Sequence, residues 1–253
     1  MAYAVASRER SPETAPPRPW WRRPWLVPLA VLVAGFLAFS LPPYLSLDPG
    51  RSRVPSTFVL HYPLLVAHVL FGSVALVAAM FQVWPWFRQH HHTAHRRIGR
   101  AYVLAGALPA GVVGLILGVA TPFGPFIRVS NVMMASLWLA FTLTGFLMAR
   151  HGRYAEHRRW MIRSFALAYS IILNRLIGVA AFLALNPQLD TTFQGNEEWM
   201  VQAVAGITGW LSWVSALLAA EWWLEHRGDP SAADGITPRP ILRTPDMTDP
   251  ATP

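Results

Sequence analysis

Six long apolar runs dominate the sequence and constrain the fold more than any other feature. Each has the roughly 20 residues that a helix needs to cross the hydrocarbon core of a bilayer. They cover about residues 25–45, 58–84, 101–121, 129–149, 161–185 and 199–224. With 53% apolar and only 13% charged side chains, the chain is predicted to be an all-α membrane protein, a bundle of six transmembrane helices.

The basic residues predict how this bundle is oriented. All 21 are arginines, and 17 of them lie before the first run, in or at the border of alternate loops, or after the last run, whereas 3 lie in the other loops. Because arginine-rich loops stay in the cytoplasm, we expect both the N and C termini to be cytoplasmic. The exclusive use of arginine is typical of GC-rich bacterial genomes, so the predicted location is the bacterial cytoplasmic membrane.

The net charge of +8 does not indicate a nucleic-acid partner, since the arginines flank apolar runs and form no separate basic domain. Residues 1–24 are basic and proline-rich, and residues 227–253 are rich in Pro, Asp, Thr and Ser, so both segments are expected to be disordered. Residues 25–226 remain as one six-helix domain. The absence of cysteine excludes thiolate metal sites and makes histidine the strongest ligand for a transition metal.

Two polar side chains lie deep within the predicted helices. His68 is close to the middle of the second run, and Arg175 lies about 21 Å into the fifth at the rise of an α-helix. No aspartate or glutamate lies in the middle of any run. Arg175 therefore either extends toward Asp190, Glu197 or Glu198 beyond the helix, or meets an anionic group such as a propionate, a lipid phosphate or a quinone oxygen.

Other histidines gather at the predicted cytoplasmic ends of the helices. His95 lies just before the third run and His157 just before the fifth. A further three, His90 to His92, are consecutive and could bind a metal ion. A solvated loop is the favoured interpretation of these three, because no carboxylate or cysteine accompanies them.

Three segments together carry a resemblance to a known family. They are the second run with its internal His68, the stretch HRRIGRAYV from His95, and the stretch HRRWMIRSFAL from His157 with Arg175 downstream. This combination, over about residues 58–175, resembles the bacterial predicted membrane proteins catalogued as domain of unknown function 2306. The resemblance implies the fold and a place for the site, but it implies no reaction.

A looser likeness is to the six-helix transmembrane b-type cytochromes, in which histidines of neighbouring helices bind haem. The likeness implies that His95 and His157, at similar depth, could face each other across one haem b. Those cytochromes have matched histidine pairs toward both membrane faces. Here His61 and His68 share one helix and have no evident partner, so at most one haem is implied.

The sequence leaves three hypotheses for function. In the favoured one, a transport, lipid-binding or assembly protein uses His68, His95, His157 and Arg175 to line a polar cavity that holds a small ligand, a quinone or a lipid, or to relay protons. In the alternative, a redox protein binds one haem b or a metal ion through His95 and His157. In the third, the histidines only tie loops to lipid headgroups. We expect the four residues to form one polar cluster, because burying each of them separately in lipid would be costly.

Overall fold

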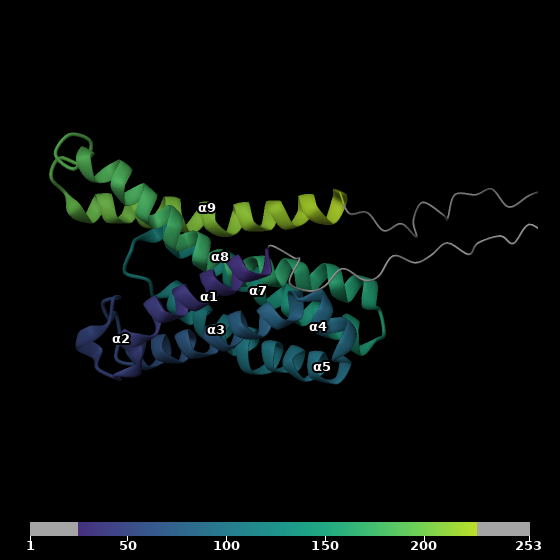
Figure 1. Ribbon diagram of the computed structural model, residues 1–253. Coiled ribbons are helices and arrows are strands. Elements are labelled where there is room, and N and C mark those ends of the chain that lie inside the picture. The colour runs from purple at the N-terminus through teal and green to yellow at the C-terminus, as the bar shows by residue number, and fades with distance from the viewer. Residues whose placement is uncertain (1–24, 227–253) are drawn as a thin grey trace, which may run out of the picture.

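The computed structural model describes residues 25–226, and every regular element in this range is a helix (Figure 1). The two segments expected to be disordered, 1–24 and 227–253, lie outside the described residues. In chain order the helices are α1 (Leu26–Ser40), α2 (Pro42–Leu45), η2 (Pro49–Arg51), α3 (His61–Val83), α4 (Pro85–His90), α5 (His92–Ala101), η3 (Tyr102–Ala107), α6 (Leu108–Val119), α7 (Pro125–Arg150), α8 (Tyr154–Leu185), η4 (Asn186–Gln188) and α9 (Glu197–His226). Of these, η2 and η4 are 3-10 helices and η3 is a π-helix.

Five helical segments of the described chain are long and apolar enough to cross a membrane. They are α3, the continuous segment His92–Val119, α7, the segment Tyr154–Gln188, and α9. These five agree with the second to sixth predicted spans. The first predicted span differs, because α1 has only 15 residues, or about 22 Å at the helical rise, against a hydrocarbon core of about 30 Å.

Two prolines explain why the first helix is short. Pro42 and Pro43 lack the N–H that would continue the helical hydrogen bonds, and their rings crowd the preceding turn. The Leu41 N–H still bonds to the Leu37 carbonyl at 2.9 Å, after which the chain restarts as the four-residue α2. The expected span is therefore two helices joined at a bend.

The long helices pack side by side, with α8 against both α7 and α9, and with α3 against η3 and α6. Figure 1 shows α1 beginning and α9 ending at the same end of the bundle, where α4 and α5 also lie. The opposite end holds α2 and the connection between α8 and α9. The arginine pattern predicts that the first of these ends faces the cytoplasm.

A cluster of buried hydroxyl groups holds the centre of the bundle together. The Tyr102 hydroxyl of η3 lies 2.6 Å from Ser164 Oγ on α8, which lies 2.7 Å from Thr142 Oγ1 on α7. Trp138 on α7 donates its indole N–H to the same tyrosine oxygen at 3.3 Å. Because lipid offers no hydrogen-bond partners, these groups satisfy one another and tie three helices together.

Close backbone contact joins α3 to η3 at one point. A Cβ atom on Gly106 would lie 2.9 Å from both the Cα and the amide nitrogen of Ala75. Backbone atoms cannot rotate aside as a side chain can. The contact therefore requires glycine at position 106, and it fixes how the third span sits against α3.

Candidate functional site

A cavity of about 330 Å³ lies among α1, α2, α3, α6, α7 and α8, near the end of the bundle that holds α2. Its walls are mostly apolar. The lining side chains that can carry charge or donate hydrogen bonds include Tyr44, Arg53, His61, His68, Asn131 and Arg175. No aspartate or glutamate is among the lining residues of the described chain. The cavity therefore contains hydrogen-bond donors and positive charge without a protein carboxylate to neutralise them.

His68 is held in a defined orientation against the third span. Its Nδ1 lies 2.9 Å from the Ala110 carbonyl oxygen, so Nδ1 carries the proton and donates it. The ring packs where Gly114 leaves room, since a Cβ there would lie 2.9 Å from the imidazole Cε1. Within the described residues Nε2 has no hydrogen-bond partner, so its lone pair is free to face the cavity.

His61, the first residue of α3, lines the same cavity. It is only 2% exposed. The backbone nitrogen and the hydroxyl oxygen of Thr57 lie 3.3 and 2.8 Å from its Nδ1. The same hydroxyl donates its one proton to the Ala120 carbonyl at 2.9 Å. The loop before α3 is thus fastened both to His61 and to the end of α6.

Arg175 reaches the cavity from α8. It makes no hydrogen bond or ion pair with any residue from 25 to 226, so neither Asp190 nor the acidic start of α9 neutralises it there. Its electrostatic neighbours are Tyr44 and a second arginine, Arg53. By contrast, Arg163 on the same helix binds both carboxylate oxygens of Glu221, at 2.5 and 2.8 Å. The structure therefore supplies a counter-ion for Arg163 and leaves Arg175, on the same helix, facing the cavity.

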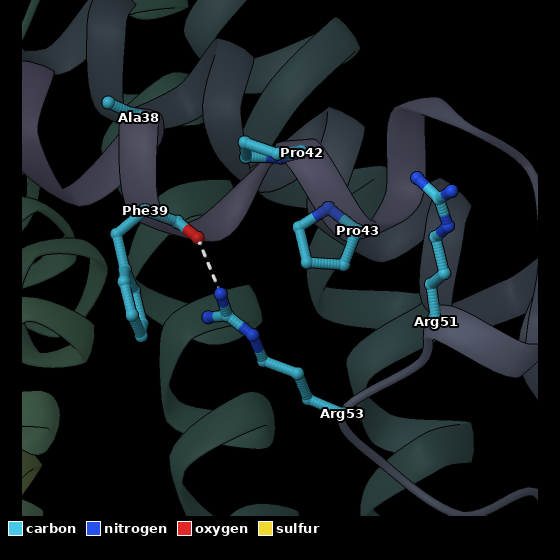
Figure 2. A pocket seen from close by; sticks show the side chains of 6 residues that line it. All are labelled: Ala38, Phe39, Pro42, Pro43, Arg51 and Arg53. Atoms are coloured by element: carbon cyan, nitrogen blue, oxygen red, sulfur yellow. Dashed lines mark hydrogen bonds between the residues drawn. The ribbon is translucent and has the colours of Figure 1, made fainter.

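Arg53 comes to the cavity from the loop between η2 and α3. Its Nη2 donates to the Phe39 carbonyl oxygen at 2.9 Å, and its guanidinium carbon lies 3.9 Å from the centre of the Phe39 ring. Figure 2 shows this arginine reaching toward α1 while Arg51 points away from Phe39. Ser40, on the cavity side of α1, has a buried Oγ with no hydrogen-bond partner among the described residues. The α1 wall thus adds a guanidinium and an unpaired hydroxyl.

The other two predicted site residues, His95 and His157, are not among the lining residues of this cavity. His95 lies two helical turns before Tyr102, and His157 lies two turns before Ser164. Because Tyr102 and Ser164 are hydrogen-bonded to each other, the two histidines lie on helix faces that meet. His157 is one of the groups that act electrostatically on His95, together with His92 and Arg88. The four expected site residues are therefore found in two groups, at opposite ends of the bundle.

The two histidines of the second group differ in their hydrogen bonding. His157 Nδ1 lies 2.7 Å from the Gly145 carbonyl oxygen, which fixes the proton on Nδ1. His95 Nδ1 is buried and has no partner among the described residues. The consecutive histidines nearby are exposed, and His90 Nδ1 bonds to the Trp86 carbonyl at 2.9 Å. Residues 25–226 contain no group of three or more histidine, aspartate or glutamate side chains placed to hold a metal ion.

Sequence reasoning missed Arg53, Tyr44 and Ser40. From the sequence, Arg53 counts only among the arginines that indicate orientation, because nothing in its sequence neighbours marks it as facing a cavity. The sequence does contain one signal for Arg53. Pro42 and Pro43 have no N–H, so carbonyl groups one turn earlier in the helix must find another hydrogen-bond donor. An arginine a few residues later is a natural donor for one of them.

The chain matches a family described as predicted membrane proteins, DUF2306, over residues 65–224. The matched region begins within α3 and ends near the end of α9. It includes His68, His95, His157 and Arg175 but not Arg53 or His61. No curated protein and no solved structure matches the chain. Since the match covers more than half of the 253 residues, the chain belongs to the DUF2306 family of predicted membrane proteins.

Proposed function

We propose that this is a multi-pass protein of the bacterial cytoplasmic membrane that binds an organic anion in the cavity beside α1 and carries it or presents it within the membrane. The observation that supports this function above all others is Arg175. It is a charged side chain on a membrane helix, it lines the cavity, and it has no counter-ion among residues 25–226. An uncompensated charge at such depth is costly unless a partner neutralises it.

The remaining lining residues support an anion rather than a cation. Arg53 and Arg175 give the cavity a formal charge of about +2 with no carboxylate present. Two unit charges about 4 Å apart interact by about 4 kcal/mol at the effective dielectric constant of a protein surface, and by more when buried. A carboxylate or phosphate would therefore be attracted, and the apolar walls would accommodate a hydrocarbon part of the same molecule.

Guanidinium groups also set the geometry of the ligand. A planar guanidinium can donate two parallel hydrogen bonds to the two oxygens of a carboxylate or phosphate. His61 adds an imidazole ring from α3 to the same lining. Uncharged ligands would leave both arginines unneutralised and are disfavoured for that reason.

Matched amphiphiles test the proposed charge preference. Dodecyl phosphate and dodecyltrimethylammonium have the same chain and opposite charge, and binding of each to the protein in lipid nanodiscs can be measured by native mass spectrometry. We expect the phosphate to bind more tightly. We expect Arg175→Leu to weaken its binding by about 10- to 100-fold, which is the range for one hydrogen bond to a charged group, and Arg175→Lys to weaken it less.

Arg128→Leu is the matched control, because Arg128 is an exposed arginine on α7 that does not line the cavity. It should leave binding of dodecyl phosphate unchanged. Equal binding of the two amphiphiles, or equal effects of the substitutions at positions 175 and 128, would show that the cavity does not select anions.

A second candidate function is redox chemistry at His95 and His157. It is favoured by one observation: His157 keeps Nε2 available because its Nδ1 bonds to Gly145, and His95 has a buried nitrogen without a partner. Imidazole nitrogens of this kind are common ligands of haem and transition metals, and the hydrogen bond at Nδ1 is the usual support for such a ligand. The visible absorption spectrum of the purified protein, oxidised and then reduced with dithionite, tests this. A spectrum without a Soret band excludes haem.

A further inference from the structure

This inference rests on the proposed function and concerns the source of the anion. It begins with α1, the short helix that forms one wall of the cavity. Val33 is the single buried residue of α1, whereas Val27, Val31, Leu32 and Phe39 are exposed. The main contacts of α1 outside α2 are with α3 and α8, and they are few. One wall of the cavity is therefore weakly attached to the rest of the bundle.

Parts of the other walls are closely packed. A Cβ on Gly111 would lie 2.7 Å from the Leu139 side chain of α7, and a Cβ on Gly114 would lie 2.9 Å from His68 of α3. The packing of α1 against α8 is less extensive than its packing against α3. The seam between α1 and α8 is therefore the weaker side of α1, and Arg175, which is exposed, lies on the α8 side of this seam.

The end of α1 is held by a single polar contact. In a continuous helix the Phe39 carbonyl would accept a hydrogen bond from residue 43, but Pro43 has no N–H to donate. Arg53 supplies the missing donor, and its guanidinium also stacks on the Phe39 ring (Figure 2). The same guanidinium lines the deep cavity. The Arg53 side chain therefore both holds the end of α1 in place and faces the ligand.

We propose that the anion is the headgroup of a lipid of the surrounding bilayer, which reaches the cavity sideways between α1 and α8, with Arg53 as the latch on α1. A cavity of about 330 Å³ is the size of a small-ligand site and is too small for a whole two-chain lipid. The headgroup occupies the cavity, and the acyl chains remain in the hydrocarbon. An anionic oxygen is a stronger acceptor than the neutral Phe39 carbonyl, so a bound headgroup draws Arg53 away and frees α1.

The absence of cysteine makes this testable with one introduced thiol. Ser73 lines the cavity from α3, so Ser73→Cys reports access to it. Its alkylation by N-ethylmaleimide is measured in vesicles of phosphatidylcholine alone, of phosphatidylcholine with phosphatidylglycerol, and of phosphatidylcholine with soluble glycerol 3-phosphate added. We expect phosphatidylglycerol to slow alkylation and glycerol 3-phosphate to have no effect. Equal protection by both, or protection by the soluble anion alone, overturns the lipid source, and so does the absence of any protection.

The latch is tested in the phosphatidylcholine vesicles without any anion. Arg53→Gln should speed alkylation of Ser73→Cys by about tenfold, the factor expected for loss of one hydrogen bond to a charged group. Arg51→Gln is the matched control, since the Arg51 side chain pairs with the exposed Asp48, at 3.6 Å, and does not line the 330 Å³ cavity. Equal rates for the two variants refute the latch.

A second variant guards against misfolding of the first. Pro43→Ala restores the missing N–H to the Phe39 carbonyl and favours helix, so it frees Arg53 without weakening α1. It too should speed alkylation, and a rate equal to that of Arg51→Gln contradicts the latch. These experiments distinguish a failure of the lipid hypothesis from a failure of the proposed anion-binding function. If dodecyl phosphate binds through Arg175 but phosphatidylglycerol gives no protection, the anion site stands and the lipid source is wrong.

Discussion

Removing one hydroxyl group from the centre of the bundle tests what holds the helices together. Tyr102 is completely buried, and its hydroxyl contacts Ser164 Oγ at 2.6 Å and accepts from Trp138 Nε1 at 3.3 Å. Tyr102→Phe keeps the ring and its edge-on contact with Phe165, whose centroid lies 4.9 Å away. It removes both hydrogen bonds and leaves the indole N–H of Trp138 without a partner.

The size of the loss follows from these contacts. Interhelical hydrogen bonds in membranes contribute about 0.6 kcal/mol each on average, and a buried donor without a partner costs about 1–3 kcal/mol. Ser164 keeps its bond to Thr142 at 2.7 Å, so only the tryptophan is left unpaired. We therefore expect Tyr102→Phe to lower the free energy of unfolding by about 2–3 kcal/mol.

The chain provides a matched control in Tyr62. Its hydroxyl is also buried but has no hydrogen-bond partner among the described residues. Tyr62→Phe makes the same chemical change and should leave stability unchanged or slightly raised, since no bond is lost. Reversible unfolding in mixtures of dodecyl maltoside and sodium dodecyl sulfate, followed by circular dichroism, gives both values. Equal effects of the two substitutions would refute the hydroxyl cluster as a determinant of stability.

Three further predictions concern packing, charge and orientation. Gly106→Ala should destabilise the protein, because the new methyl group meets the backbone of Ala75. Gly35→Ala should be neutral, or stabilising by up to about 1 kcal/mol, because alanine has the higher helix propensity and the methyl group meets no atom. Thermal unfolding in detergent compares the two variants. Arg163→Met and Glu221→Gln should each destabilise the pairing of α8 with α9. A double-mutant cycle should give a coupling free energy of about 1–2 kcal/mol, between the values for exposed and buried ion pairs. Additive losses would argue against the ion pair. A reporter fused after Gly152, in the turn between α7 and α8, should be active only in the cytoplasm, and periplasmic activity would reverse the predicted orientation.

The sequence by itself determined where the membrane helices lie. In hydrocarbon the backbone has no solvent to bond with, so a long apolar run has to satisfy its own N–H and C=O groups as a helix. This is why the bounds of α3, α7, α8 and α9 differ from the expected runs by only a few residues, apart from the N-terminal extension of α8. The first run departed from expectation because Pro42 and Pro43 interrupt it, and apolar composition does not register a missing N–H.

Only the tertiary structure determined which polar side chains line the same cavity. His68 and Arg175 were recognisable from the sequence as polar groups at membrane depth, yet their common cavity depends on how α3 and α8 are rotated about their axes. That rotation is set by contacts between distant residues, such as Gly106 against Ala75. Arg53 entered the cavity because the loop after α2 folds back onto the broken end of α1. Hydropathy reports the depth of a residue along a helix, but helix rotation and neighbours arise from packing between helices, which no single run of sequence contains.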